Sequence, residues 1–297
     1  MPYDSVVCVK QVPDTGNVTA AAISADGTVN RAALPTVFNP EDLNALEVAL
    51  QIRDRHGGSV TAISMGPPKA SDVLRECLYR GADRVVLLTD RLAAGSDTQA
   101  TSYILSQAIR KLGRFDFVFC GRQAIDGDTG QVGPQCAEKL FIPQITCLEE
   151  IVNIEAGTVR ARRSLGHGWE VVEAPLPILA TVAETANQPR HPAAKRVFRF
   201  KRARSPAELL RELGDDAKHV PFGQVLESYF ELGLLIEQWS LNDLDADLSR
   251  CGLVGSPTRI QRIRSIILGK TEYKELPPTE QGVRQLTDEL LADHVLG

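Results

Sequence analysis

One glycine-rich stretch holds the residues whose types and spacing could do chemistry. It runs Gly121-Arg-Gln-Ala-Ile-Asp-Gly-Asp-Thr-Gly-Gln-Val-Gly-Pro-Gln135, between an apolar run and a segment of helical character. Glycines occupy positions 121, 127, 130 and 133. Because glycine carries no Cβ atom, such a turn can point several backbone N–H groups the same way, and a following helix adds the positive end of its dipole. A turn of this kind can receive a phosphate group.

The spacing of these glycines leaves a second interpretation open. Neither G-x-G-x-x-G nor G-x-x-x-x-G-K-[ST] is present, so the common dinucleotide and P-loop patterns do not apply. Asp126 and Asp128 would repel a phosphate unless their carboxylates turn away. From spacing alone, a tight turn with a helix cap and a phosphate cradle are equally good interpretations.

Other reactive residue types form no recognisable pattern. The six cysteines form no C-x-x-C pair and the five histidines form no H-E-x-x-H motif. Since most of the cysteines lie in apolar runs, we expect buried thiols rather than a disulfide, an iron–sulfur cluster or a zinc site. We also find no nucleophile and no general acid–base pair, so we expect neither a metal site nor catalysis by this chain alone.

Composition narrows the class of protein. With 297 residues the chain can bury a large α/β core. A net charge of −5 argues against nucleic-acid binding, although residues 190–204 form a local basic run. No apolar segment approaches the length that spans a bilayer, and no signal peptide precedes the first predicted strand. We expect a cytoplasmic protein without membrane insertion.

The elements that must position the glycine-rich stretch alternate along the chain. Continuous apolar runs predict strands over 5–10, 59–65, 84–88 and 115–120. Helices are predicted between them, the first with Asn39 as its N-cap and Pro40 at its first position. This alternation predicts an α/β fold with a doubly wound, mostly parallel, Rossmann-like sheet. Its ligands are expected beyond the carboxyl ends of strands, at the tips after Lys10, Met65 and Cys120.

The pattern changes after residue 145. Alternating residues over 158–164 and 169–173 predict a hairpin, and a further strand is predicted over 176–182. A capping box, Ser205-Pro-Ala-Glu208, opens a helical segment. The apolar residues from Val225 to Trp239 have no predicted place, because the sheet is already complete. A final helix is predicted over 280–295.

The glycine-rich stretch also resembles the adenine-nucleotide loop of the β subunit of electron-transfer flavoproteins. Three more stretches resemble the same family, in family order: Val7-Cys-Val-Lys-Gln-Val-Pro-Asp14, Asn39-Pro-Glu-Asp42 and Cys251-Gly-Leu-Val-Gly-Ser-Pro-Thr258. The resemblance implies a fold of adenine-nucleotide-binding, universal-stress-like type. It implies a β subunit that pairs tightly with an α subunit. Such a heterodimer passes electrons between a dehydrogenase and an acceptor, for example a quinone- or ferredoxin-linked oxidoreductase.

The resemblance also implies which residues bind the nucleotide. They are Cys8, Asn39, Pro40, Glu41, Asp42, Met65, Gly121, Arg122, Gln123, Ala124, Ile125, Asp126, Gly127, Asp128, Thr129, Gly130, Gln131 and Val132. Asn39 and Thr129 offer side-chain hydrogen bonds to ribose or phosphate, and a cap or turn bond is the alternative use of each. Gln123 and Gln131 are further candidates.

Two nucleotides compete for this site. The loop is similar to that of flavin-bifurcating members, and Gly127 and Gly130 leave room for a second phosphate, which FAD has and AMP lacks. We predict FAD here, with bifurcation as one mode of action. The alternative is AMP in this subunit and FAD in the α subunit. A universal-stress-type sensor of ATP or AMP without redox activity is the competing class of protein, although its usual glycine spacing is absent.

Residues 190–250 are predicted to form a basic loop and helical insertion that docks a partner. They follow a nucleotide-binding domain over 1–189 and precede a tail over 251–297 that packs on the partner subunit. Members that serve acyl-CoA dehydrogenases carry an anchoring leucine where this chain has Ala194, which offers less apolar area. We expect positive charge to steer the electron-exchange partner and Val197, Phe198 and Phe200 to hold it.

Overall fold

The computed structural model describes residues 1–14, 34–258 and 275–292. Within them, one mixed sheet has nine strands in the order β11-β5-β4-β1-β6-β10-β7-β8-β9, and a two-stranded ribbon pairs β2 with β3. The strands are β1 Ser5–Cys8, β2 Gln11–Pro13, β3 Thr36–Phe38, β4 Val60–Met65, β5 Arg84–Leu88, β6 Phe117–Gly121, β7 Gln144–Glu155, β8 Thr158–Ser164, β9 Trp169–Pro175, β10 Ile178–Val182 and β11 Glu237–Trp239. The predicted doubly wound, mostly parallel sheet is confirmed.

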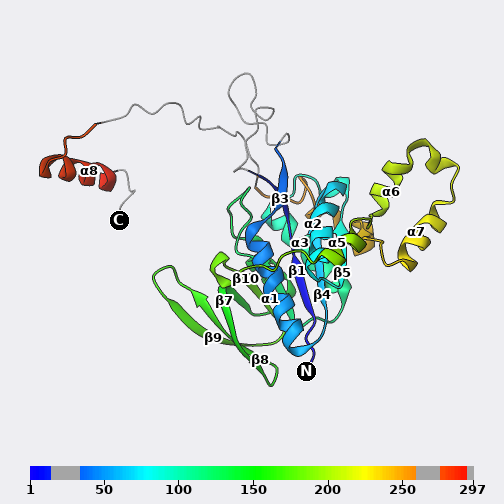
Figure 1. Ribbon diagram of the computed structural model, residues 1–297, viewed down its shortest axis with the longest axis horizontal. Helices are drawn as coiled ribbons and strands as arrows, with labels where there is room; N and C mark the ends of the chain where they lie inside the picture. The colour runs from blue at the N-terminus through cyan, green and yellow to red at the C-terminus, as the bar shows by residue number, and fades with distance from the viewer. Residues whose placement is uncertain (15–33, 259–274, 293–297) are drawn as a thin grey trace.

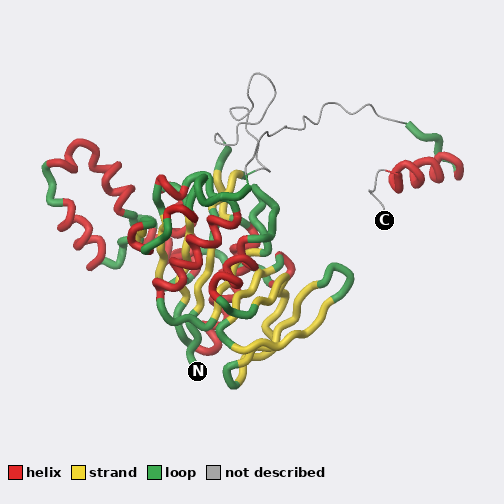
Figure 2. Tube along the Cα trace, turned by 180° about the vertical axis from the view of Figure 1, so that it is seen from behind, coloured by secondary structure: helices red, strands yellow, loops and turns green. Residues whose placement is uncertain are grey.

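Helices cover both faces of the sheet (Figures 1 and 2). The α-helices of the described residues are α1 Pro40–His56, α2 Ser71–Arg80, α3 Thr98–Leu112, α4 Val132–Leu140, α5 Ala194–Phe200, α6 Pro206–Leu213, α7 Phe222–Glu231 and α8 Glu280–Ala292. Alternate residues of the buried strands supply two cores. Phe117 and Phe119 of β6 face α1 and α2, whereas Val118 faces α3 and α4. Because side chains alternate between the two faces of a strand and both faces are covered here, the sequence of each buried strand is largely apolar.

Strand order reverses between β1 and β6. From β1 the chain extends the sheet through β4 and β5, and then returns to add β6 and β10 on the other side of β1. Such a reversal opens a crevice at the carboxyl ends of the two central strands, because the connections on either side leave toward opposite faces. The glycine-rich stretch begins at the end of β6, beside this crevice.

Three local expectations were wrong or incomplete. The strand predicted over 5–10 ends at Cys8, and Gln11–Pro13 forms a separate short strand, β2. The helix after the glycine-rich stretch begins at Val132 rather than near Cys136. The predicted hairpin is present, but it is preceded by β7, a twelve-residue strand absent from the prediction. The glycine- and alanine-containing stretch after Asp14 lies largely outside the described residues.

The sheet is not complete before residue 225, contrary to the prediction. Glu237–Trp239 pairs in parallel with β5 and becomes the sheet's edge strand β11. Leu234 and Ile236 are buried in the same core as α1 and α2. Part of the apolar surface from Val225 to Trp239 is therefore core. Leu232 and Phe230 remain exposed.

α6 and α7 stand away from the body of the molecule (Figure 1). The predicted capping box is confirmed at the start of α6: Ser205 accepts from the N–H of Glu208, and the Glu208 side chain accepts from the N–H of Ser205. A nearly buried ion pair fixes this end to α2, because Arg75 Nη1 and Nη2 each lie 2.9 Å from a Glu208 carboxylate oxygen. The predicted final helix is α8, and residues 293–295 of its predicted range lie outside the described residues.

Candidate functional site

A large open cavity lies at the carboxyl ends of β1, β4, β5 and β6. Its volume is about 1650 Å³, and its wall includes the tips predicted from sequence, at Cys8 to Lys10, Met65 and Cys120. The glycine-rich stretch forms one side from Gly121 to Gly133. The opposite side is formed by the segment after β5, from Leu88 to Thr98, with the loop residues Leu253 and Val254.

Two glycines are required by the close packing at the base of this loop. A Cβ atom on Gly121 would lie 2.6 Å from an Asp42 carboxylate oxygen, and one on Gly133 would lie 2.8 Å from Cys120 Sγ. Gly133 therefore lets α4 approach β6 closely enough for its first turn to border the cavity. Gly130 has φ +61°, and a Cβ atom on Gly127 would meet open space. The middle of the loop therefore has room for a ligand.

The first turn of α1 holds the loop in shape. Asn39 Nδ2 donates to the carbonyl of Gln123 at 2.9 Å, and its Oδ1 accepts from the N–H of Ile125 at 3.2 Å. Glu41 accepts from the N–H of Gln123 at 2.7 Å and pairs with Arg122 at 3.0 Å. Asn39 occupies the N-cap position but makes no side-chain cap hydrogen bond, so its predicted capping bond is wrong. Its amide instead pairs two loop backbone groups.

Asp42 connects the loop to β1. It accepts from the N–H of Gly121 at 2.9 Å and from the N–H of Lys10 at 2.8 Å. Burial raises the pKa of this carboxyl to about 7, and the N–H groups of Gly121 and Lys10, together with the Asn39 amide, limit the rise. Near neutral pH this group is therefore only partly ionised.

Asp126 does not face the cavity as a bare charge. Lys10 Nζ lies 2.8 and 2.7 Å from its two carboxylate oxygens. The repulsion expected between Asp126 and a phosphate is therefore offset by a neighbouring cation. Asp128 has φ +51°, a left-handed conformation that aspartate tolerates in turns.

Most of the predicted nucleotide-binding residues lie together. Fourteen line the cavity: Cys8, Asp42, Met65, Gly121, Arg122, Gln123, Ala124, Asp126, Gly127, Asp128, Thr129, Gly130, Gln131 and Val132. The other four, Asn39, Pro40, Glu41 and Ile125, are not on its wall. Asn39 and Glu41 lie behind the loop and support it.

Sequence reasoning predicted the strand tip after Lys10 but did not include the Lys10 side chain among the binding residues, and it missed the far wall of the cavity. β5 ends at the same edge of the sheet as β4, so the topology alone could have added Asp90 to the wall. Asp90 accepts from the N–H groups of Leu92 and Leu241, and Asp97 accepts from those of Ala100 and Thr258. These carboxylates shape the loops after β5. No local motif marked them, because they act through distant backbone groups.

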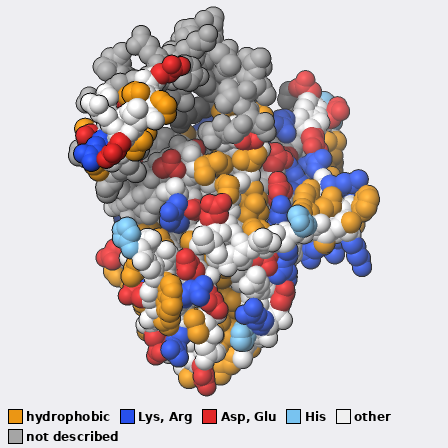
Figure 3. Space-filling view, turned by 60° about the vertical axis from the view of Figure 1, so that its left-hand side comes forward, with side chains coloured by type: hydrophobic (Ala, Val, Ile, Leu, Met, Phe, Trp, Pro, Cys, Tyr) orange, Lys and Arg blue, Asp and Glu red, His pale blue; other side chains and the backbone are white. Residues whose placement is uncertain are grey.

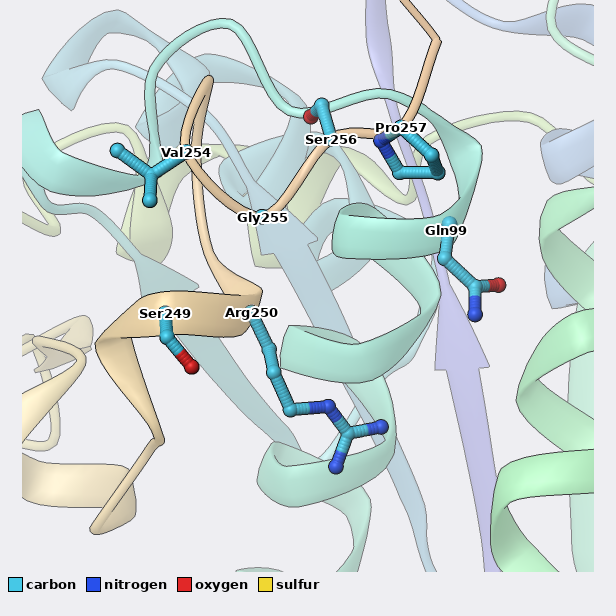
Figure 4. A pocket seen from close by; sticks show the side chains of 7 residues that line it. All are labelled: Gln99, Ser249, Arg250, Val254, Gly255, Ser256 and Pro257. Atoms are coloured by element: carbon cyan, nitrogen blue, oxygen red, sulfur yellow. The ribbon is translucent and has the colours of Figure 1, made fainter.

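A smaller cavity of about 510 Å³ lies beside α3 (Figure 4). It is lined by Gln99, Ser249, Arg250, Val254, Gly255, Ser256 and Pro257. The Arg250 guanidinium stands 3.9 Å from the centre of the Tyr103 ring. Ser256 donates to the carbonyl of Gly252 at 2.7 Å and accepts from the N–H of Asp97 at 2.8 Å. The loop over residues 251–258 is therefore packed against the start of α3 and supports the wall of the larger cavity.

The six cysteines are free thiols; Cys77, Cys120, Cys136 and Cys251 are buried, and Cys8 and Cys147 are partly exposed. Burial raises the pKa of the Cys8, Cys120 and Cys136 thiols, so they are protonated and unreactive near neutral pH. No group of histidine, cysteine or acidic residues within the described ranges could hold a metal ion. No helix in that part of the chain is long and apolar enough to cross a bilayer.

The chain is a doubly wound α/β protein with a cavity at the point where strand order reverses, the place where such folds bind nucleotides. The family described as "Electron transfer flavoprotein domain" matches residues 26–204. An "Electron transfer flavoprotein subunit beta" from Clostridium acetobutylicum is 38% identical over 98% of this chain and 99% of its own length. The chain belongs to the electron transfer flavoprotein β-subunit family.

Other relatives have related names. "Protein FixA" from Azorhizobium caulinodans is 41% identical over 87% of this chain and 83% of the relative. "Acryloyl-CoA reductase electron transfer subunit gamma" from Anaerotignum propionicum is 38% identical over 98% of both chains. These names confirm the electron-transfer interpretation and leave the universal-stress alternative without support.

Proposed function

We propose that this chain is the β subunit of a heterodimeric electron-transfer flavoprotein and binds FAD in the large cavity. The heterodimer carries electrons from a dehydrogenase to an acceptor oxidoreductase, and its partner is an electron-transfer flavoprotein α subunit. FAD supplies the one- and two-electron redox chemistry. The residues of this chain bind the cofactor, orient it and limit its contact with water.

The observation that carries the choice of FAD is the extent of the cavity. At about 1650 Å³ it exceeds the 300–1,000 Å³ typical of small-ligand sites. It continues from the glycine-rich loop to the loops after β5 and to Leu253, beyond the space that a mononucleotide needs. We assign the adenosine and phosphates to the side bounded by Met65 and the loop. The remaining length accommodates a second half of a dinucleotide.

The phosphates would lie against residues Gly127 to Val132 and the start of α4. Open space beside Gly127 allows a close approach to the backbone, and the first turn of a helix presents unpaired N–H groups. Arg122, on the same wall, pairs with Glu41 behind the loop. That pair holds the loop at the end of β6, so the binding surface is formed before the ligand arrives.

Co-expression with the α subunit tests this function. We expect the purified heterodimer to be yellow and to release two FAD molecules per heterodimer on denaturation, as identified by chromatography and mass spectrometry. One FAD with one AMP would assign AMP to this subunit and would contradict the proposed dinucleotide site. Two flavins would also allow bifurcation, which is tested by coupled reduction of a high- and a low-potential acceptor.

A further inference from the structure

Lys10 and Asp126 form an ion pair at the mouth of the nucleotide cavity. Lys10 follows the tip of β1 and Asp126 belongs to the glycine-rich loop, and both line the cavity. Lys10 Nζ approaches both carboxylate oxygens, at 2.7 and 2.8 Å. The side chains are 47% and 24% exposed, so water reaches the pair.

The main chain of Lys10 is fixed while its side chain is free to turn. Its N–H donates to Asp42 at 2.8 Å, which holds the backbone at the end of β1. The ammonium group stands on a flexible four-carbon chain with three donors. An exposed ion pair of this kind contributes little to stability, so exchanging the partner of Lys10 costs little.

The charge around the cavity favours such an exchange. The acidic residues on its described wall are Asp42, Asp90, Asp97, Asp126 and Asp128, and the basic ones are Lys10, Arg91 and Arg122. Arg122 already pairs with Glu41. A ligand with two phosphates would bring more negative charge to a wall that holds few cations. Among the described wall residues Lys10 is the only lysine. It borders the loop where phosphates are expected.

We propose that Lys10 exchanges Asp126 for a phosphate oxygen when the adenine nucleotide binds. This inference rests on the proposed nucleotide site. In the free site Lys10 neutralises Asp126 and keeps the loop from repelling an anion. On binding, the ammonium group turns to the phosphate and Asp126 turns toward water. Asp126 is then a competitor of the phosphate, and its charge sets how tightly phosphate-bearing ligands bind.

The two members of the pair therefore have opposite effects on affinity. Lys10→Met removes the cation and leaves Asp126 as a bare negative charge, so binding of FAD and AMP should weaken at least about tenfold, the value of one charge-assisted hydrogen bond. Asp126→Asn frees Lys10 and removes the competing charge, so both ligands should bind several-fold more tightly. If the pair only tied the loop to β1, both substitutions would weaken binding.

The experiment uses the heterodimer freed of nucleotide and titrated with FAD, AMP and adenosine by calorimetry. Adenosine carries no phosphate, so its affinity should be the same in the wild type, Lys10→Met and Asp126→Asn. Lys10→Arg, which keeps the charge, should retain FAD and AMP affinity within a few-fold. Higher salt should shrink the loss caused by Lys10→Met, because the interaction is electrostatic.

Two results would overturn the exchange. One is weaker AMP and FAD binding by Asp126→Asn. The other is an equal loss of adenosine and AMP affinity in Lys10→Met. If the wild-type heterodimer bound none of the three ligands at this subunit, the nucleotide site itself would be wrong. Thermal unfolding of the free variants shows whether each substitution leaves the fold intact.

Discussion

At the scale of single residues, the first turn of α1 acts on the cavity through the loop it supports. Asn39 is fully buried, and its amide donates to one loop carbonyl and accepts from one loop N–H. An amide side chain can make both bonds at once, whereas a carboxylate only accepts. This explains why the position behind the loop suits asparagine.

Asn39→Ala should therefore lower nucleotide affinity. It leaves two loop groups without partners, each costing about 1 to 3 kcal/mol if they stay buried, and the loop relaxes to reach water. We expect FAD to bind about tenfold more weakly in a titration of the nucleotide-free heterodimer.

Asn44→Ala is the matched control. Asn44 is buried on the same helix, but its amide donates to the carbonyls of Glu184 and Asn187, away from the loop. This substitution should lower the thermal midpoint and leave FAD affinity nearly unchanged. Equal losses of affinity in both variants would refute the specific role of Asn39.

Asp42 makes stability depend on pH. Its pKa of about 7 in the folded chain lies above the ordinary value of 3.8, mainly because of burial. A carboxyl with a raised pKa favours folding when it is protonated, so its contribution is complete below about pH 4 and is lost as the pH rises to 7. The slope is at most about 1.4 kcal/mol per pH unit.

The amide of Asp42→Asn is neutral at every pH, so this variant lacks the pH-dependent contribution of Asp42 to stability. The wild type should therefore lose stability relative to the variant as the pH is raised from 5 to 7.5, measured by denaturant unfolding of the nucleotide-free heterodimer. Parallel stability curves for the two proteins over this range would contradict the raised pKa.

At the scale of elements, the sequence predicted what depends on local pattern. The buried parallel strands are continuous apolar runs, and the capping box of α6 is a local signal, so both were found. β11 has three residues, and its place is defined by parallel pairing with β5, which lies far away along the chain. The role of Lys10 likewise depends on Asp126. Pairings at this separation leave no mark on a local pattern.

The predicted docking segment around α5 also contains pairings with distant residues that its local sequence did not reveal. Three basic residues in or near α5 bind within the chain: Arg190 pairs with Glu47, Arg196 donates to the carbonyl of Leu78, and Arg204 pairs with Glu212. Phe200 is buried in the core, so it cannot hold a partner as predicted. Phe198 is exposed, with Lys201 over its ring. The residues that remain available to dock a partner are Phe198 for the apolar contact and the exposed Lys195, Arg199, Lys201 and Arg202 for the positive charge.

Replacing Arg199, Lys201 and Arg202 together by Ser should slow electron transfer to the partner. Clustered charge raises the encounter rate, so the effect should be largest at low ionic strength. Stopped-flow flavin oxidation at several salt concentrations measures it. Arg199→Lys combined with Arg202→Lys keeps the charge and should transfer at the normal rate. A loss of the α subunit instead would assign this surface to heterodimer assembly.

Phe198→Ala tests the apolar contact separately. Phe198 and Phe230 are 69% and 70% exposed, the first on α5 and the second on α7. Phe198→Ala should raise the apparent KM for the partner at every salt concentration, because apolar contacts are not screened. Phe230→Ala is the matched control with the same loss of area. An effect confined to Phe230→Ala would move the docking surface to α7.

At the scale of the whole molecule, hydrophobic side chains lie open among charged ones (Figure 3). On β9 and the turn before it, Leu165, Trp169 and Val171 are exposed, and on α8 so are Val283, Leu286 and Leu291. Within the described range of α8, Gly282 is the only buried residue, and the other residues of the helix are at least partly exposed. Apolar faces of this kind mark surfaces that a partner covers.

We therefore expect the chain made alone to aggregate and the co-expressed heterodimer to be monodisperse, as measured by light scattering after size-exclusion chromatography. Val283→Lys combined with Leu286→Lys should reduce recovery of the α subunit, because charge on an apolar contact face is costly to bury. Arg284→Ser is the matched control, since Arg284 is exposed on the same helix and pairs only with its neighbour Glu280 among the described residues. The wall residues of the nucleotide cavity lie before residue 259, so any heterodimer that does assemble should keep its flavin. A stable, monodisperse monomer, or normal assembly of the double variant, would show that α8 is not covered by the α subunit.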